Sequence, residues 1–200
     1  MSLFSSKFVK QSLLALSSLS IVLATLANQP AHAGSPVSLF STTCLTTSVW
    51  NSSIDSFIQA TGNVTIGDEV YTFVGAIRSG YEFMGSPHIR SGTPAGVACR
   101  ITPSNSKPRF QTLNLKFGFS NNNSNTTNTS RAKLTVLIDG NSSNCQKEIG
   151  KGELLSCLVN ITNVKSIALK GECLSDGNCP AIVFTEASLI PLPISPGRRN

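Results

Sequence analysis

Few residues of this chain have the types and spacing that catalysis requires. A serine or cysteine nucleophile needs a histidine base, and the only histidine after residue 33 is His88. Most of the 10 acidic residues fall in turns or at the ends of expected strands. The sequence singles out no pair of carboxylates of the kind that a glycosidase uses. We therefore predict that the protein is not an enzyme. A small hydrolase built on Glu/Asp pairs ranks last of three functional alternatives.

Other residue types suit the binding of a sugar. An aromatic face can stack on a pyranose ring, and polar side chains in loops can meet sugar hydroxyls. Two loops are expected to contact a ligand, Ser120–Arg131 and Cys173–Cys179. Tyr71 is also an aromatic candidate, but it lies in an expected strand and is assigned to the core. The predicted ligand-binding residues are two aromatic and four polar ones: Trp50, Tyr81, Asn122, Asn125, Asp176 and Asn178.

No metal or other cofactor is predicted. Asp176 and Asn178 offer oxygen atoms of the kind that calcium prefers. One Asp and one Asn are too few ligands, however, and a tight turn is the preferred interpretation. Structural zinc sites contain closely spaced pairs of Cys or His, and the sequence contains no such pair.

The cysteines predict disulfide bonds instead. An even count in an exported chain indicates three bridges, because oxidising compartments preserve them. The sequence alone cannot choose among the many pairings of Cys44, Cys99, Cys145, Cys157, Cys173 and Cys179. Short intervening segments suggest Cys173–Cys179, and Cys145–Cys157 across an expected hairpin, which leaves Cys44–Cys99.

The first 33 residues have the three parts of a secretory signal. Lys7 and Lys10 make the start basic, Leu13–Leu26 is apolar, and Ala31-His32-Ala33 is a cleavage sequence. An uncleaved membrane anchor is the alternative, but the apolar run is short and rich in hydroxyl groups for a spanning helix. We expect residues 1–33 to be a cleavable signal peptide. The mature protein is then secreted, periplasmic or at the cell surface, without a membrane association.

Charge argues against nucleic acid as a partner. Cleavage removes two of the 16 basic residues and none of the 10 acidic ones, which leaves a mature net charge of +4. The remaining basic residues are scattered along the sequence, whereas nucleic-acid binders gather theirs in a stripe or patch. Attraction to anionic surfaces or polysaccharides is left open, and a solvated surface is the preferred interpretation.

Alternating apolar and polar residues predict a β-protein. Phe110–Phe119 and Arg131–Ile138 each present one apolar and one polar face, as half-buried strands of antiparallel sheets do. We expect one antiparallel β-sandwich over residues 34–190, a short helix near Ser53–Gln59 and an irregular proline-rich tail over residues 191–200. Weaker strands are expected at Asn63–Ile66, Glu69–Ala76, Gly96–Ile101, Leu154–Val159, Val164–Leu169 and Ala181–Ile190.

The order of these segments resembles the NPCBM family of carbohydrate-binding modules. The resemblance covers roughly residues 66 to 189 and rests on Ile66–Tyr71, Gly75–Ile77, Leu113–Ser120, Leu134–Gly140, Val164–Leu169 and Ala181–Leu189. The chain departs from the family where Asn and Ser replace acids after Gly118, and where Phe184 and Glu186 stand in the usual places of Trp and Asp. Membership implies a galactose-binding-like jelly roll and a sugar ligand.

The leading functional hypothesis is therefore non-catalytic binding of a carbohydrate, such as a cell-surface polysaccharide. The alternative is a secreted structural or adhesive protein whose sandwich binds another secreted protein. A shared sandwich fold hosts many functions, so the fold by itself does not choose between them.

Overall fold

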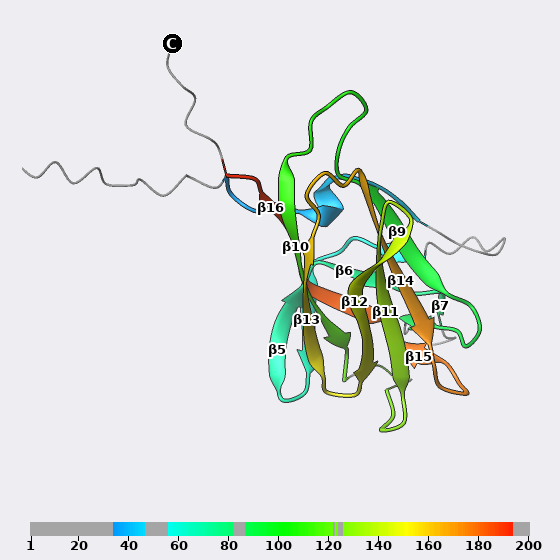
Figure 1. Ribbon diagram of the computed structural model, residues 1–200. Coiled ribbons are helices and arrows are strands. Elements are labelled where there is room, and N and C mark those ends of the chain that lie inside the picture. Colours follow the sequence, from blue (N-terminus) through cyan, green and yellow to red (C-terminus); the bar gives the residue numbers. More distant parts are fainter. Residues whose placement is uncertain (1–33, 47–55, 82–86, 122, 124–125, 194–200) are drawn as a thin grey trace, which may run out of the picture. The chain divides into compact units, whose positions relative to one another are not determined.

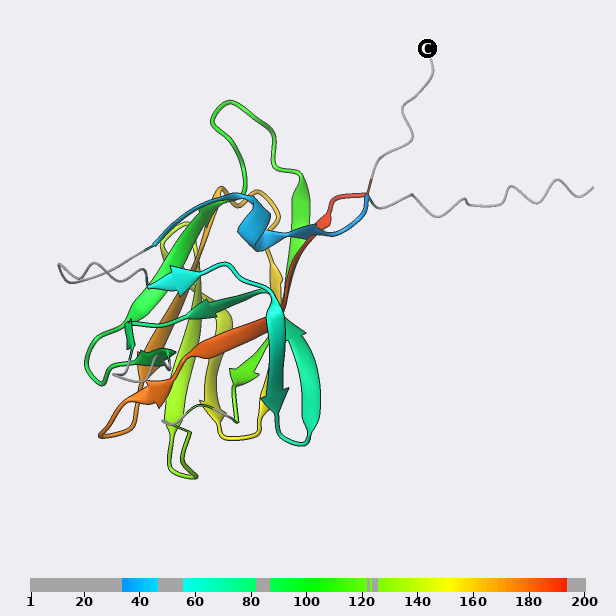
Figure 2. The same ribbon diagram turned by 180° about the vertical axis from the view of Figure 1, so that it is seen from behind.

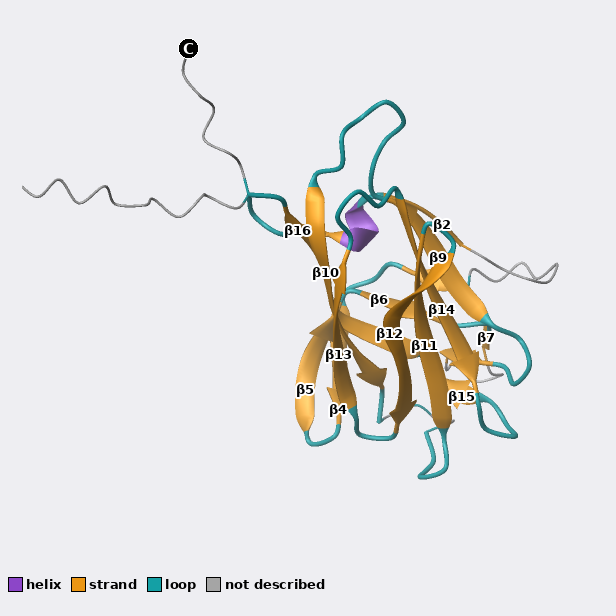
Figure 3. Cartoon of the chain, in the orientation of Figure 1, coloured by secondary structure: helices purple, strands orange, loops and turns teal. Residues whose placement is uncertain are grey.

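The computed structural model describes residues 34–46, 56–81, 87–121, 123 and 126–193. All of them belong to one compact unit, residues 31–200. Their only helix is the short 3-10 turn η1 (Leu39–Ser41), and the rest of the regular structure is β-strand (Figure 3). No helix in these ranges is long and apolar enough to cross a membrane.

Two antiparallel sheets carry most of the strands (Figure 1). The first sheet has the order β13 (Leu154–Asn160), β10 (Phe110–Phe119), β16 (Ile182–Pro191), β6 (Gly75–Ile77) and β3 (Phe57–Ile58), with β1 (Val37–Ser38) also paired to β16. The second sheet has the order β12 (Asn141–Gly150), β11 (Arg131–Ile138), β14 (Ser166–Cys173), β9 (Ala95–Arg100) and β2 (Thr43–Thr46).

Two small sheets complete the arrangement. One is the hairpin of β4 (Gly62–Ile66) and β5 (Glu69–Phe73), drawn in cyan tones in Figures 1 and 2. The other has the order β15 (Cys179–Pro180), β8 (Pro87–Ile89) and β7 (Gly80–Tyr81).

The core lies between the two main sheets. Alternate residues of β10 and β11 are fully buried there, including Leu115, Phe117, Leu134 and Val136. Burial of such side chains contributes about 1.5–3 kcal/mol each, which is why the apolar face of each strand turns inward. The aromatic rings of Phe40, Phe57, Phe117 and Phe184 contact one another in the same core.

The structure confirms the expected antiparallel β-sandwich and the bounds of β10 and β11. It also shows that the expected strand Glu69–Ala76 is two strands, β5 and β6, which belong to different sheets. The strand β12 was not predicted, because only Cys145, Ile149 and Gly150 of its ten residues are buried. Backbone pairing with β11 holds this edge strand in place, and Cys145 and Ile149 are the side chains that it adds to the core.

The helix expected near Ser53–Gln59 is wrong where the structure describes it. Phe57 and Ile58 form β3 and pair with Ile77 and Ala76 of β6. Phe57 is buried against the ring of Phe40. Pairing and aromatic packing therefore outweigh the local preference of this short segment.

The three disulfides join Cys44 to Cys99, Cys145 to Cys157, and Cys173 to Cys179. The pairings are those expected, two from short intervening segments and Cys44–Cys99 by elimination, but the hairpin expected between Cys145 and Cys157 is wrong. These two cysteines lie on β12 and β13, which belong to different sheets, so the bridge ties the two layers together. The chain crosses between the layers at Lys151–Glu153.

Candidate functional site

The two loops predicted to contact a ligand lie together. The backbone amide of Arg131 donates a hydrogen bond to the Ser175 hydroxyl at 2.8 Å. The same hydroxyl donates to the Thr129 carbonyl at 3.0 Å, and the amide of Leu174 donates to the Arg131 carbonyl at 2.9 Å. Three hydrogen bonds thus join the end of the Ser120–Arg131 loop to the Cys173–Cys179 loop.

Strand pairing explains why these loops meet. The beginning of β11 pairs with the end of β14, with Ala132 opposite Cys173. The first loop therefore enters β11 where the second leaves β14. The disulfide to Cys179 closes the second loop, and Cys179 itself starts β15, which pairs with β8.

A pocket of about 580 Å³ lies between the two loops, and we call it the loop pocket. Its size falls in the range of small-ligand sites. One side is formed by the Ser120–Arg131 loop, the other by the Cys173–Cys179 loop, and β12 adds one carboxylate. The lining residues are Thr127, Thr129, Ser130, Arg131, Glu148, Leu174, Ser175, Asp176, Gly177 and Asn178.

The lining offers both hydrogen-bond donors and acceptors. Arg131 can only donate, Glu148 and Asp176 accept when ionised, and the amide of Asn178 does both. Leu174 is 47% exposed and supplies an apolar surface beside these groups. One positive and two negative side chains give the pocket a net lining charge of −1. Such a surface suits a ligand with several hydroxyl groups and no negative charge.

The structure places only part of the predicted ligand-binding set. Asp176 and Asn178 both line the loop pocket, and their role in ligand binding stays a prediction. Trp50, Asn122 and Asn125 lie outside the described residues.

Tyr81 is described only as backbone, in β7. This strand pairs with β8, which in turn pairs with β15, so the backbone of Tyr81 lies two strands from the segment that follows Asn178. The structure describes no aromatic side chain in the loop pocket.

Arg131 and Glu148 line the pocket but were not named among the predicted ligand-binding residues, although Arg131 ends the loop Ser120–Arg131 that was expected to contact a ligand. Arg131 is the first residue of a predicted strand, and a charged residue at the junction of a polar loop and a strand is a usable signal. Glu148 lies on β12, which itself was not predicted, so no local pattern pointed to it.

Tyr71 is half-buried rather than fully buried. It packs against the small cluster formed by Val64, Ile66, Ala76 and Val183. Its hydroxyl donates a hydrogen bond to the Glu69 carboxylate. This hydrogen bond raises the pKa of Tyr71 above its usual value, and partial desolvation and the Glu69 charge act in the same direction.

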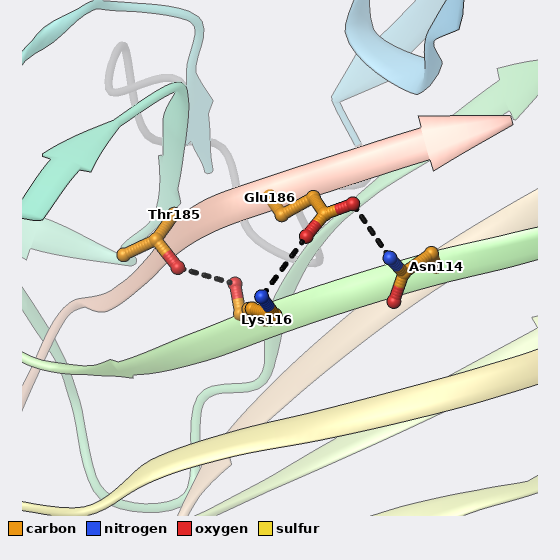
Figure 4. Close-up of polar contacts among 4 residues, drawn as sticks. All are labelled: Asn114, Lys116, Thr185 and Glu186. Atoms are coloured by element: carbon orange, nitrogen blue, oxygen red, sulfur yellow. Dashed lines mark hydrogen bonds and ion pairs between the residues drawn. The ribbon is translucent and has the colours of Figure 1, made fainter. Parts of the chain in front are cut away.

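One acid of the first sheet is engaged by neighbouring side chains. The Glu186 carboxylate accepts a hydrogen bond from the Asn114 amide at 2.6 Å and pairs with the Lys116 ammonium at 3.5 Å (Figure 4). The single described histidine, His88, is 3% exposed. Within the described ranges, no group of three or more His, Cys, Asp or Glu side chains is placed to hold a metal ion.

The fold is that of solved carbohydrate-binding modules. The CBM51-2 and INT domains of ZmpB from Clostridium perfringens, solved with GlcNAc, match with a TM-score of 0.55 at 13% identity over 79% of this chain. The CBM51 module of GH95 from the same organism, solved with methyl-galactose, matches with a TM-score of 0.54 at 10% identity over 78% of this chain. At these identities the likeness concerns the fold alone.

The two matches differ in how much of the other structure they cover. This chain spans 32% of the ZmpB structure and 99% of the GH95 module. No protein-family model matches the chain, so its resemblance to the NPCBM family stays a prediction. No curated protein matches it either.

Proposed function

We propose that the protein is an exported, non-catalytic carbohydrate-binding protein whose sugar occupies the loop pocket. The observation that carries the proposal is the hydrogen-bonded junction of the two loops, which gathers polar side chains around one concavity. The fold supports it, since two modules of this architecture are solved with GlcNAc and with methyl-galactose.

The chemistry of the lining fits the hydroxyl groups of a sugar. A carboxylate such as Asp176 accepts from two neighbouring hydroxyls, and the guanidinium of Arg131 donates to their oxygens. Asn178 and the hydroxyls of Thr127 and Thr129 extend this set. The net lining charge of −1 favours a neutral hexose or N-acetylhexosamine over an acidic sugar.

The pocket is held in shape before the ligand arrives. The Cys173–Cys179 disulfide closes one wall, and Ser175 ties that wall to the other. A preordered site loses less conformational freedom on binding, which raises affinity for a given set of contacts.

Export and family membership belong to the same proposal. A cleavable signal at residues 1–33 would deliver the chain to a compartment where its three disulfides persist. The ordered motifs from Ile66 to Leu189 support a place near the NPCBM family, although Phe184 and Glu186 depart from its usual residues.

A glycan array probed with the purified protein tests the function. We expect weak binding to neutral glycans that soluble sugar competes away. Asp176→Ala and Asn178→Ala should each lower the affinity about tenfold, because each removes hydrogen bonds to the ligand. Asp68→Ala and Asn144→Ala are matched controls, since both residues are exposed and neither lines the loop pocket.

A second candidate function is protein binding by a secreted adhesive protein. Large apolar side chains are exposed on two edge strands, Leu45 of β2 at 71% and Leu158 of β13 at 68%. Edge strands can accept a strand from a partner, with exposed side chains adding specificity. Two results together would favour this candidate. No glycan on the array, neutral or acidic, is bound, and another secreted protein binds with an affinity that Leu158→Ser abolishes.

A further inference from the structure

Three basic residues from two separate parts of the sequence gather at the other end of the sandwich. Arg100 ends β9, Arg109 precedes β10, and Lys165 precedes β14. The turn residue Asp139 lies beside them and follows β11, the strand that Arg131 of the loop pocket begins. A strand of this length spans about 25 Å, so this group and the loop pocket are separate sites.

The basic residues line two adjoining pockets, which we call the basic pockets. The larger, of about 680 Å³, is lined by Arg100 and Lys165, together with Ser104, Asn105 and Ser106 of the loop between β9 and β10. The second, of about 420 Å³, is lined by Arg100 and Arg109. Arg100 and Pro103 line both, so the two pockets share a wall.

None of the three cations is neutralised by a described acid. The two ion pairs in the described ranges are Lys116–Glu186 and Lys170–Glu172. Arg109 lies over the buried ring of Phe110, 5.7 Å from its centroid, which supports the guanidinium without cancelling its charge. Arg100 contacts only the hydroxyl of Ser104, at 3.5 Å, among the side-chain partners described.

The one acid in the basic pockets is already engaged. The carboxylate of Asp139 accepts hydrogen bonds from the backbone amides of Lys165 at 3.1 Å and Ser166 at 2.8 Å, and from the Ser166 hydroxyl at 3.1 Å. These donors stabilise its charge in the turn that leads into β12. Counting this acid, the pockets carry a net lining charge of +2, opposite in sign to the loop pocket.

We propose that the basic pockets are a second binding site, for the carboxylate, sulfate or phosphate groups of an anionic polysaccharide. The cations attract the charged groups, and the hydroxyl and amide side chains of Ser104, Asn105 and Ser106 suit the sugar hydroxyls between them. This inference does not depend on sugar binding in the loop pocket. Such a site attaches this end of the sandwich to an acidic extracellular matrix or cell wall.

Other anionic partners fit the pockets less well. Single-stranded nucleic acid is usually held by exposed aromatic rings that stack on its bases, and the described aromatic ring here, Phe110, is 5% exposed. An anionic membrane is usually met by a longer cluster of basic residues. A polar loop flanked by a few cations is better matched to a charged sugar chain.

The test uses the purified protein and a fluorescent heparin oligosaccharide at low salt. The double variant Arg100→Gln/Lys165→Gln should weaken binding about fivefold, as expected when two exposed charge contacts are lost. The matched control Lys133→Gln/Lys147→Gln removes the same charge from β11 and β12 and should change binding less than about twofold. Thermal midpoints of both variants verify that they are folded.

Further binding measurements identify the anionic group that is bound and exclude other classes of partner. Binding of oligogalacturonate would assign carboxylates and binding of heparin would assign sulfates, whereas neutral dextran should not bind. Asp176→Ala should leave heparin binding unchanged, which separates this site from the loop pocket. The proposal is wrong if both double variants lose binding equally, if neither acidic sugar binds, or if a single-stranded oligonucleotide or anionic vesicles bind more tightly than the acidic sugars.

Discussion

The backbone amide of Arg131 and the hydroxyl of Ser175 form a 2.8 Å hydrogen bond between residues 44 positions apart in the chain. The same hydroxyl donates to the Thr129 carbonyl, so Ser175 both accepts from one loop residue and donates to another. A side chain with these two roles fixes the distance between the walls of the loop pocket. Its removal should therefore affect the pocket more than the sandwich.

Ser175→Ala should lower the free energy of unfolding by about 1 kcal/mol, because the hydrogen bonds are exposed and water replaces them in part. Affinity for the sugar should fall more than this small loss of stability suggests, since the walls are no longer joined. Urea denaturation and a binding titration measure the two effects. Ser142→Ala on the exposed face of β12 is the control, and equal affinities for both variants would contradict the role of Ser175.

Replacing both Cys173 and Cys179 by serine should weaken sugar binding while the sandwich stays folded. The bridge closes a short loop with a sequence separation of 6, so its loss should cost about 2 kcal/mol of stability. The Cys145–Cys157 bridge, which joins the two main sheets, is the comparison. Its removal should cost about 3 kcal/mol and leave affinity nearly unchanged. Denaturation curves and binding titrations of both double variants provide the test. A larger loss of sugar affinity on removal of the Cys145–Cys157 bridge than on removal of the Cys173–Cys179 bridge would overturn the prediction.

The main strands could be predicted from the sequence because their burial is periodic. Leu113, Leu115, Phe117 and Phe119 all face the core, and their alternation with polar residues is visible in the sequence. The edge strand β12 and the short β3 could not be predicted in this way. Their places depend on backbone pairing with β11 and β6, and no local pattern in the sequence records that pairing.

Gly118 is expected to tolerate no side chain. A Cβ atom at this position of β10 would lie 2.5 Å from the carbonyl oxygen of Glu153, a backbone atom that cannot move aside cheaply. Gly118→Ala should therefore lower the free energy of unfolding by about 1–3 kcal/mol, as overpacking does elsewhere. Gly177→Ala is the control, because nothing lies within 4 Å of the place that a Cβ atom would take there. Thermal denaturation of both variants measures the difference, and equal midpoints would contradict the steric account.

Tyr71 should ionise at a higher pH than an ordinary tyrosine, whose pKa is about 10. Only its protonated hydroxyl donates to Glu69. The contact therefore contributes fully to the stability of the fold below the ordinary tyrosine pKa of about 10, and this contribution is lost as the pH rises through the raised pKa of the folded state. Absorbance titration at alkaline pH, taken as the difference from Tyr71→Phe, measures the value. Glu69→Gln should bring the pKa of Tyr71 down, and an unchanged pKa in that variant would show that burial alone raises it.

Most of the loop pocket could be anticipated from sequence, because nine of its ten lining residues lie in the two loops expected to contact a ligand. Asp176 and Asn178 stand in a loop bounded by two cysteines, which marks it as short, exposed and fixed in shape. Arg131 ends a loop that was itself expected to contact a ligand, whereas Glu148 joins the pocket only because β11 pairs with β12. The cluster of Arg100, Arg109 and Lys165 was hidden for the same reason, since Lys165 reaches the two arginines only because β14 pairs with β9.

An amide-resolved NMR titration of the protein with the best neutral glycan from the array is the most direct test of whether a neutral sugar binds in the loop pocket. We expect saturable shifts concentrated at residues 127–131 and 174–178, with Asp176→Ala reducing both affinity and shifts. Shifts confined to other parts of the sandwich, or full affinity in Asp176→Ala, would contradict it.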